Sequence, residues 1–85
     1  MLKITILKDK KLADYTSWSI WECEPSQFDW EYGSEEHCFI IDGNVTVKTD
    51  TETVNIVSGD YVIFPKGLQC NWHVHSEIKK HYTFK

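Results

Sequence analysis

Apolar and polar residues alternate along most of the chain with a period of two, which predicts β-strands because successive strand side chains point to opposite faces. Phe28, Trp30 and Tyr32, for example, alternate with two acidic residues. A helical period is nearly absent, and its one candidate, residues 10–15, is short and poorly patterned. We expect strands at 3–7, 18–23, 28–32, 36–41, 45–48, 54–56, 61–64, 72–75 and 79–84.

Residues that favour turns separate these strands. The segment 42–44, Asp-Gly-Asn, strongly predicts a tight hairpin, because Gly and Asn tolerate positive φ. Residues 50–51 predict a second hairpin, and the Gly- and Pro-containing segments 58–60 and 65–67 predict turns. Short strands joined at this spacing are typical of an all-β sandwich or barrel.

Length and composition restrict the class of protein. The chain has 85 residues and a net charge of −4, so we expect one domain that spans residues 1–85. An acidic chain is a poor match for nucleic-acid phosphates, and no apolar run is long enough to cross a membrane. The first twenty residues lack the apolar stretch of a signal peptide. We therefore expect a cytoplasmic protein with neither nucleic acid nor membrane as a partner.

Cysteine and aromatic residues add two expectations. Cys23, Cys38 and Cys70 are odd in number and form no Cys-x-x-Cys pair, which favours reduced, buried thiols over a zinc or redox motif. The 4 Trp, 4 Tyr and 4 Phe supply much of the apolar surface of a small core. Since a core of this size leaves a small margin of stability, we expect a homodimer through the N-terminal strand or a sheet face.

The spacing of glycine, proline and acidic residues resembles that of the cupins, which are small jelly-roll barrels. One cupin motif has a Glu seven residues before a Gly, as Glu36 precedes Gly43 here. A second motif has the spacing of Gly59, Pro65 and Gly67, followed three residues later by a His position. The match covers about half of the chain. It implies an all-β, single-domain cupin jelly-roll barrel, also called a double-stranded β-helix.

A closer resemblance is to the small single-domain cupins named after the cupin domain of (S)-ureidoglycine aminohydrolase, which have an RmlC-like jelly roll. It rests on Trp21-Glu22, on Phe-Asp-Trp-Glu-Tyr at 28–32 and on Lys-His-Tyr at 80–82. It also rests on Gly-Asp-Tyr-Val-Ile-Phe-Pro-Lys-Gly at 59–67. The resemblance implies this fold from about residue 18 to the C-terminus, and most stand-alone members of the group have no assigned reaction.

For the metal-binding cupins, the resemblance implies an ion held by three His and one Glu. The equivalent positions here hold Trp30, Tyr32, Glu36 and Cys70. Trp offers only an N–H donor and Tyr a phenol of high pKa, so one carboxylate and one thiol remain as ligands. We therefore predict no metal at the usual cupin site and no other cofactor.

The same positions describe a pocket if the strands keep their parity. The side chains that then point inward are those of Trp30, Tyr32, Glu36, Cys38 and Ile40. On the other strand, Cys70, Trp72 and Val74 point inward too. The resemblance also places inward the face of the last strand that contains Lys80. The result is an aromatic cavity that suits a small polar metabolite with a planar or cationic part. Its expected ligand-binding residues are Trp21, Trp30, Tyr32, Cys70, Trp72, Lys80 and Tyr82.

Glu36 is the candidate catalytic residue of this pocket. A glutamate is usually exposed, as Glu35 beside it is expected to be. An inward Glu36 needs a partner, which Lys80 or a tyrosine hydroxyl can supply, and a perturbed pKa would suit it to proton transfer. The converging aromatic residues can equally be ordinary core, and Cys70 lacks an inward His that would make it a nucleophile.

The histidines do not join this pocket by parity. His73 and His75 share one strand face, opposite to the inward one, so we expect an exposed pair rather than a metal site. His37 and His81 are also out of phase with the pocket. The lysines at positions 8, 10 and 11, mixed with Asp9, predict a solvated charged surface.

Three functions remain open. The first is a metal-free module that binds a small metabolite in the aromatic cavity. The second is an enzyme, which by resemblance to ureidoglycine aminohydrolase would act on a ureido or amino compound, with Glu36 as acid–base and Lys80 or Tyr82 stabilising charge. The missing His ligands argue against that metal-dependent reaction but not against metal-free isomerase or lyase chemistry. The third is a structural or partner-binding protein whose cavity is filled by its own side chains.

Overall fold

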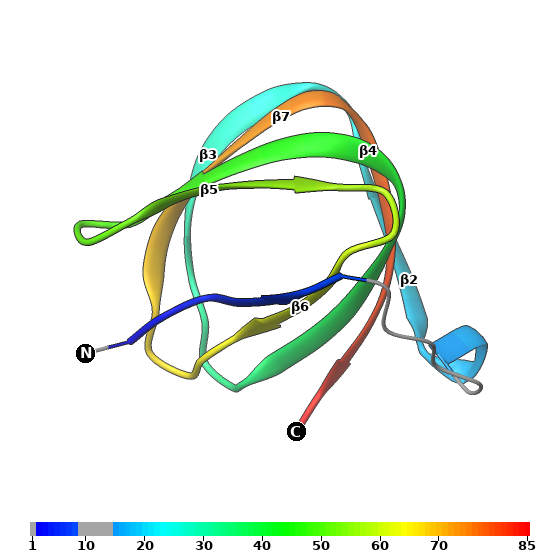
Figure 1. Ribbon diagram of the computed structural model, residues 1–85, viewed down its shortest axis with the longest axis horizontal. Coiled ribbons are helices and arrows are strands. Elements are labelled where there is room, and N and C mark those ends of the chain that lie inside the picture. Colours follow the sequence, from blue (N-terminus) through cyan, green and yellow to red (C-terminus); the bar gives the residue numbers. More distant parts are fainter. Residues whose placement is uncertain (1, 9–14) are drawn as a thin grey trace.

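The computed structural model describes residues 2–8 and 15–85, which form one β-barrel (Figure 1). The predicted all-β class is confirmed, while the helix candidate at 10–15 lies outside the described residues apart from Tyr15. No helix of the described residues is long and apolar enough to span a membrane. The elements are β1 (Thr5–Leu7), the 3-10 helix η1 (Tyr15–Ser17), β2 (Ser19–Cys23), β3 (Ser26–Glu31), β4 (Glu36–Lys48), β5 (Thr53–Val57), β6 (Tyr61–Phe64) and β7 (Gln69–Phe84).

Two long antiparallel strands, β4 and β7, build both halves of the barrel. The first half of β4 pairs with β6 and with the last part of β7. The second half of β4 pairs with β5 and with the first part of β7. The strand pair is extended by β2 and β3, which both pair with β7, and by β1, which pairs with β6. The strands thereby wrap around one core, as expected of a jelly roll (Figure 1).

The hairpin predicted at 42–44 is wrong, because β4 continues through this segment as one strand. Gly43 has a φ of +116°, and a Cβ on it would lie 2.7 Å from both Glu77 O and Ile78 Cα of β7. Glycine thus permits a close approach of the two strands where their register shifts, and this bulge lets them bend. The strands predicted at 72–75 and 79–84 are likewise one continuous strand, β7, which bends together with β4.

The remaining predicted turns are confirmed. Residues 49–52 join β4 to β5, and the Thr49 N–H donates to Glu52 O at 2.8 Å. The Thr49 hydroxyl accepts the Glu52 N–H at 3.0 Å, which closes the same turn. The Gly-containing segment 58–60 joins β5 to β6, and the segment 65–67 joins β6 to β7.

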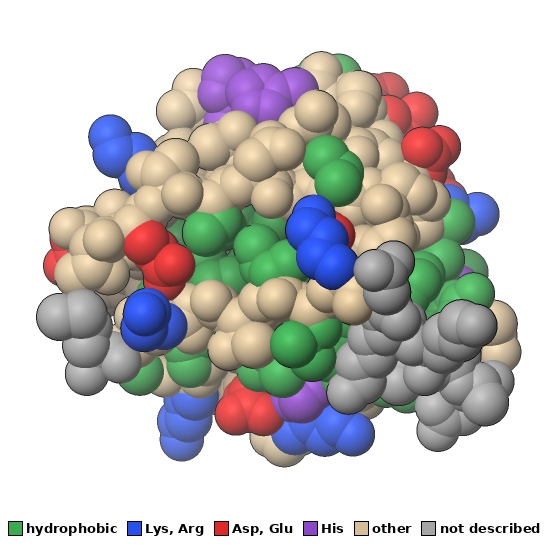
Figure 2. Space-filling model, viewed as in Figure 1, with side chains coloured by type: hydrophobic (Ala, Val, Ile, Leu, Met, Phe, Trp, Pro, Cys, Tyr) green, Lys and Arg blue, Asp and Glu red, His purple; other side chains and the backbone are tan. Residues whose placement is uncertain are grey.

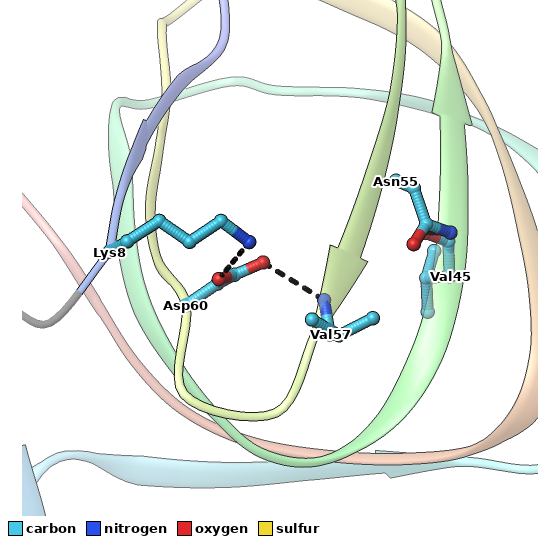
Figure 3. Close-up of polar contacts among 5 residues, drawn as sticks. All are labelled: Lys8, Val45, Asn55, Val57 and Asp60. Atoms are coloured by element: carbon cyan, nitrogen blue, oxygen red, sulfur yellow. Dashed lines mark hydrogen bonds and ion pairs between the residues drawn. The ribbon is translucent and has the colours of Figure 1, made fainter.

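Lys8 makes a specific contact and is not only part of a charged surface. Its ammonium donates to Oδ1 of the buried Asp60 at 2.7 Å, and Asp60 Oδ2 accepts the Val57 N–H at 3.0 Å (Figure 3). The contact ties the end of β1 to the turn between β5 and β6. Lys10 and Lys11 lie outside the described residues.

The strand faces lie as their parity predicts. Cys38, Ile40 and Val74 point into the core and are 1% exposed or less. His73 and His75 are exposed on the outer face of β7, and histidine side chains gather at the top of the molecule in Figure 2. The expectation that this pair points away from the pocket is therefore confirmed.

Candidate functional site

A cavity of about 290 Å³ lies within the barrel, walled by side chains of β2, β3, β4 and β7 and by Tyr32. It contains Glu36 and, apart from Cys70, every residue expected to bind a ligand. The structure therefore brings these residues together, while their role in binding remains a prediction. The lining residues are Trp21, Phe28, Trp30, Tyr32, Glu36, Trp72, Lys80, Tyr82 and Phe84.

A buried ion pair forms part of the cavity wall. Lys80 Nζ donates to Glu36 Oε2 at 2.6 Å, and each residue is 5% exposed. Glu36 is the first residue of β4, whereas Lys80 of β7 lies opposite Ile40, four residues further along β4. Glu36 and Ile40 share the inward face, so the long lysine side chain extends along this face to reach Glu36. The partner that a buried Glu36 requires is thus Lys80.

Aromatic rings surround the Lys80 ammonium on several sides. Its Nζ lies 4.8 Å from the Trp72 ring centroid and 5.0 Å from that of Trp21. The centroids of Phe64 and Tyr82 are 5.8 and 5.9 Å away. Cation–π attraction of this kind strengthens when the cation is withdrawn from water. The cation that the aromatic wall holds is therefore one of the protein's own side chains.

Tyr32 is fixed through both its backbone and its ring. Its N–H donates to Leu68 O at 3.0 Å, and its carbonyl accepts the Gly67 N–H at 2.7 Å. The ring stacks on Phe64 with centroids 4.7 Å apart. Burial, followed by the nearby charge of Glu36, raises the pKa of the phenol far above its usual value. Tyr32 therefore presents a neutral hydroxyl.

Trp72 forms the centre of the aromatic wall. Its ring stacks against Phe28 at 6.2 Å and meets Trp21 edge to face at 5.8 Å. Its buried Nε1–H has no hydrogen-bond partner among the described residues. Burial raises the pKa values of Tyr32 and Cys70, and the same N–H acts to lower them, so it is directed toward these two residues although neither contact meets hydrogen-bond geometry.

Trp30 lies at the rim of the cavity, which corrects in part the prediction that it points inward. Its side chain borders the cavity, yet the residue is 52% exposed. The physical reason is that β3 pairs with β7 alone in the described sheet, so no strand covers its other side. Phe84, which is 54% exposed, adds a second apolar side chain that the rim leaves in solvent.

Two residues of the wall were not among those expected to bind a ligand. Phe28 shares its parity with Trp30 and Tyr32, and Phe84 shares its parity with Lys80. The alternation therefore contained the signal for both. Strand pairing brings both to the same cavity, because Phe28 pairs in the register with Trp72 of β7 and Phe84 pairs with Glu36 of β4.

Cys70 does not line the cavity, contrary to its expected place in the wall. It pairs in the register with Trp30, and its thiol donates to the Trp30 carbonyl at 3.6 Å, which turns the sulfur toward β3. Burial raises the pKa of Cys70 to about 11 and that of Cys38 to about 12. Both are protonated near neutral pH and are therefore weak nucleophiles.

His37 and His81 are half-buried and lie outside the cavity. His37 Nδ1 and Nε2 lie 2.6 Å from Tyr61 Oη and from a Glu35 carboxylate oxygen, respectively. His81 Nδ1 lies 3.3 Å from Trp18 O. Both residues are out of phase with the pocket, as expected.

The residues at the usual cupin metal positions do not fit a divalent cation. Trp30 offers an N–H donor, Tyr32 a neutral phenol, and Cys70 a thiol that donates to a carbonyl. Glu36 is already paired at 2.6 Å with an ammonium, which repels a second cation. In the part of the chain that the structure describes, no three His, Cys, Asp or Glu side chains are grouped to hold a metal.

A small jelly-roll barrel with a ligand-sized cavity between its strands defines a cupin-type domain. Residues 11–82 match the family described as the EutQ-like cupin domain. The chain belongs to this family. A comparison with curated proteins finds no match.

Solved structures extend this assignment. A DUF861-family protein from Thermotoga maritima is 41% identical over 100% of both chains, with a TM-score of 0.88. The EutQ protein of Clostridium difficile is 27% identical, covers 74% of this chain and 50% of its own, and has a TM-score of 0.68. Neither the family nor these two structures points specifically to ureidoglycine aminohydrolase.

Proposed function

We propose that this domain binds a small, largely planar metabolite in the cavity beside Lys80, without a metal. The observation that carries the proposal is the buried Glu36–Lys80 pair within an aromatic wall that leaves about 290 Å³ open. Ligand pockets span about 300–1,000 Å³, so this one suits a small metabolite better than a nucleotide. A purely structural barrel would fill this space with its own side chains, so the open volume favours ligand binding over a structural role.

The charges in the wall favour a ligand with a hydrogen-bond acceptor over a cationic ligand. The Lys80 ammonium has three donors, one of which meets Glu36, and the others can reach a carbonyl or carboxylate oxygen. A ligand cation would find the aromatic faces occupied by Lys80 and the Glu36 charge already paired. The aromatic walls favour a planar group, because flat rings stack with little loss of freedom.

Thermal-shift screening and calorimetric titration test this proposal. The panel contains planar carboxylates, ureides, amino acids, sugars and ethanolamine. Ethanolamine is included because a Salmonella typhimurium structure of the same fold carries the name ethanolamine utilization protein Q. We expect planar carboxylates to raise the melting temperature and ethanolamine to leave it unchanged.

Two adjacent lysines provide the matched variants for this test. Lys80→Met removes the ammonium from the cavity, whereas Lys79→Met removes an exposed one that lies 3.9 Å from Glu22. We expect the first variant to lose binding while its circular dichroism still shows a folded chain, and the second to retain binding. Equal affinity of both variants for the same compound would place its binding site elsewhere.

An acid–base role of Glu36 is a second candidate function. It is favoured by the 2.6 Å contact between Glu36 and an ammonium inside a ligand-sized cavity, where the pair can exchange a proton with a bound substrate. Candidate reactions are metal-free isomerase or lyase chemistry and a ureidoglycine aminohydrolase-like reaction on a ureido or amino compound. A Glu36→Gln variant that keeps ligand affinity but loses turnover supports catalysis. Loss of both in a folded variant supports recognition alone.

We also propose that the domain forms a homodimer in the cytoplasm. The strands β1 and β2 end the path of hydrogen-bonded strands, and they carry the exposed residues Leu7 and Ile20, at 36% and 53% exposure. Edge strands with apolar side chains favour association, and the three free cysteines suit a reducing compartment. Light scattering after gel filtration measures the mass, and Leu7→Glu should yield a monomer if β1 forms the interface.

A further inference from the structure

Lys80 combines a primary amine, an adjacent carboxylate and a ligand-sized space, which are the parts needed for covalent chemistry with carbonyl compounds. We propose that Lys80 forms a reversible imine with small planar aldehydes or ketones and that Glu36 transfers the protons. The inference rests on the proposed function, because it requires that the carbonyl compound enters the same cavity.

The position of Lys80 distinguishes it from the other lysines that the structure describes. It is the lysine that lines the cavity, and it is 5% exposed, whereas the side chain of its neighbour Lys79 is 46% exposed. Glu36 Oε2 lies 2.6 Å from its Nζ, within reach of direct proton transfer. A carbonyl compound in this cavity therefore lies beside an amine that has its own proton acceptor.

The reaction needs no metal and no oxidant. The Lys80 ammonium passes one proton to the Glu36 carboxylate, and the freed lone pair on Nζ attacks the carbonyl carbon. A C–N bond forms while the carbonyl π electrons move to oxygen, which receives the proton from Glu36. A second proton moves from nitrogen through Glu36 to the hydroxyl, and the C–O bond breaks to release water. The products are an iminium on Lys80, one water molecule and an ionised Glu36.

The aromatic wall suits the product as well as the starting ammonium. The Trp72 and Trp21 centroids lie 4.8 and 5.0 Å from Nζ, so they face the positive charge before and after the reaction. The iminium is a delocalised cation with fewer N–H groups for water than an ammonium has. Phe28 and Phe84 supply further apolar surface for the carbon skeleton of the carbonyl compound.

Reductive trapping tests the imine directly. The whole chain is incubated with benzaldehyde and sodium cyanoborohydride, and the modified lysines are identified by tandem mass spectrometry. We expect benzyl-Lys80 to form at least about tenfold faster than benzyl-Lys79, since general acid–base catalysis contributes about 10²–10⁴-fold in rate. Glu36→Gln should slow the labelling of Lys80 about 100-fold while the exposed lysines react unchanged.

Two controls separate the imine from simple binding. Lys80→Arg keeps a cation beside Glu36 and should abolish labelling at this position without unfolding the chain, as judged by circular dichroism. Benzamide has a planar carbonyl group that forms no imine, so its calorimetric titration reports on binding alone. Binding of benzamide with equal labelling of Lys79 and Lys80 overturns the imine and leaves the binding function intact. Absence of both binding and selective labelling overturns both proposals for planar carbonyl compounds.

Discussion

Breaking the Glu36–Lys80 pair should remove a large part of the stability of this domain. Lys80→Met leaves a carboxylate unpaired in a site where its side chain is 6% exposed. At a separation of 2.6 Å and an effective dielectric constant of about 20, the attraction is about 6 kcal/mol, much of which offsets desolvation. Removing one partner of such a pair typically costs about 3–5 kcal/mol. The total free energy of unfolding of a chain of 85 residues is about 4–13 kcal/mol.

Urea unfolding followed by tryptophan fluorescence measures this effect in a double-mutant cycle. The cycle comprises the native chain, Lys80→Met, Glu36→Leu and the double variant. The double variant replaces both charges with apolar side chains, so we expect it to recover about 2–4 kcal/mol relative to the sum of the single losses. Lys79→Met is the control and should change stability by about 1 kcal/mol or less.

Two results would refute the reasoning about this pair. The first is an equal loss of stability in Lys80→Met and Lys79→Met, which would mean that burial of the charge does not matter. The second is a double variant that loses the sum of the two single losses, because additivity would show that Glu36 and Lys80 do not interact.

Four further predictions concern the bulge, the rim and, in two assays, the thiols. Gly43→Ala should lower the free energy of unfolding in urea by at least about 2 kcal/mol, because its Cβ would lie 2.7 Å from the β7 backbone and its φ is +116°. An unchanged free energy of unfolding would contradict the close approach of the two strands. Trp30→Ala should change stability by about 1 kcal/mol or less but weaken ligand binding about tenfold by calorimetry, since the residue is half exposed at the cavity rim. At pH 8, Ellman's reagent should label the half-buried Cys23 well before Cys38 and Cys70, whose raised pKa values keep them protonated. These two thiols ionise at lower pH in the unfolded chain, so their contribution to stability is complete below about pH 8.5 and falls as pH rises toward about 11–12. Urea unfolding from pH 8 to 10.5 measures that loss.

Local patterns determined the class of fold and the direction of most side chains. The alternation of apolar and polar residues placed Cys38, Ile40 and Val74 in the core and His73 outside it, and the structure agrees. Strand parity can be read from sequence because it depends on the backbone of neighbouring residues alone. The same parity indicated that Glu36 points inward, and it did not require knowledge of which strands pair.

Contacts between distant segments decided the features that the sequence pattern misassigned. The Asp-Gly-Asn segment favours a hairpin locally, but the approach of β4 to Ile78 of β7 makes Gly43 part of a bulge in a continuous strand. Cys70 is buried in the core as its inward parity predicts, yet its thiol donates to the Trp30 carbonyl of β3 and does not line the cavity. These outcomes depend on strand pairing, which local patterns do not specify.

The candidate site shows the same division. The alternation of residues by itself predicted aromatic residues and a glutamate at inward positions, and the resemblance to cupins added Lys80 and the small barrel. The tertiary structure decided that Lys80 reaches Glu36 across 44 residues of chain and that aromatic rings surround its ammonium. The physical reason is that burial makes an unpaired charge costly, so the fold that withdraws Glu36 from water also requires a partner charge beside it.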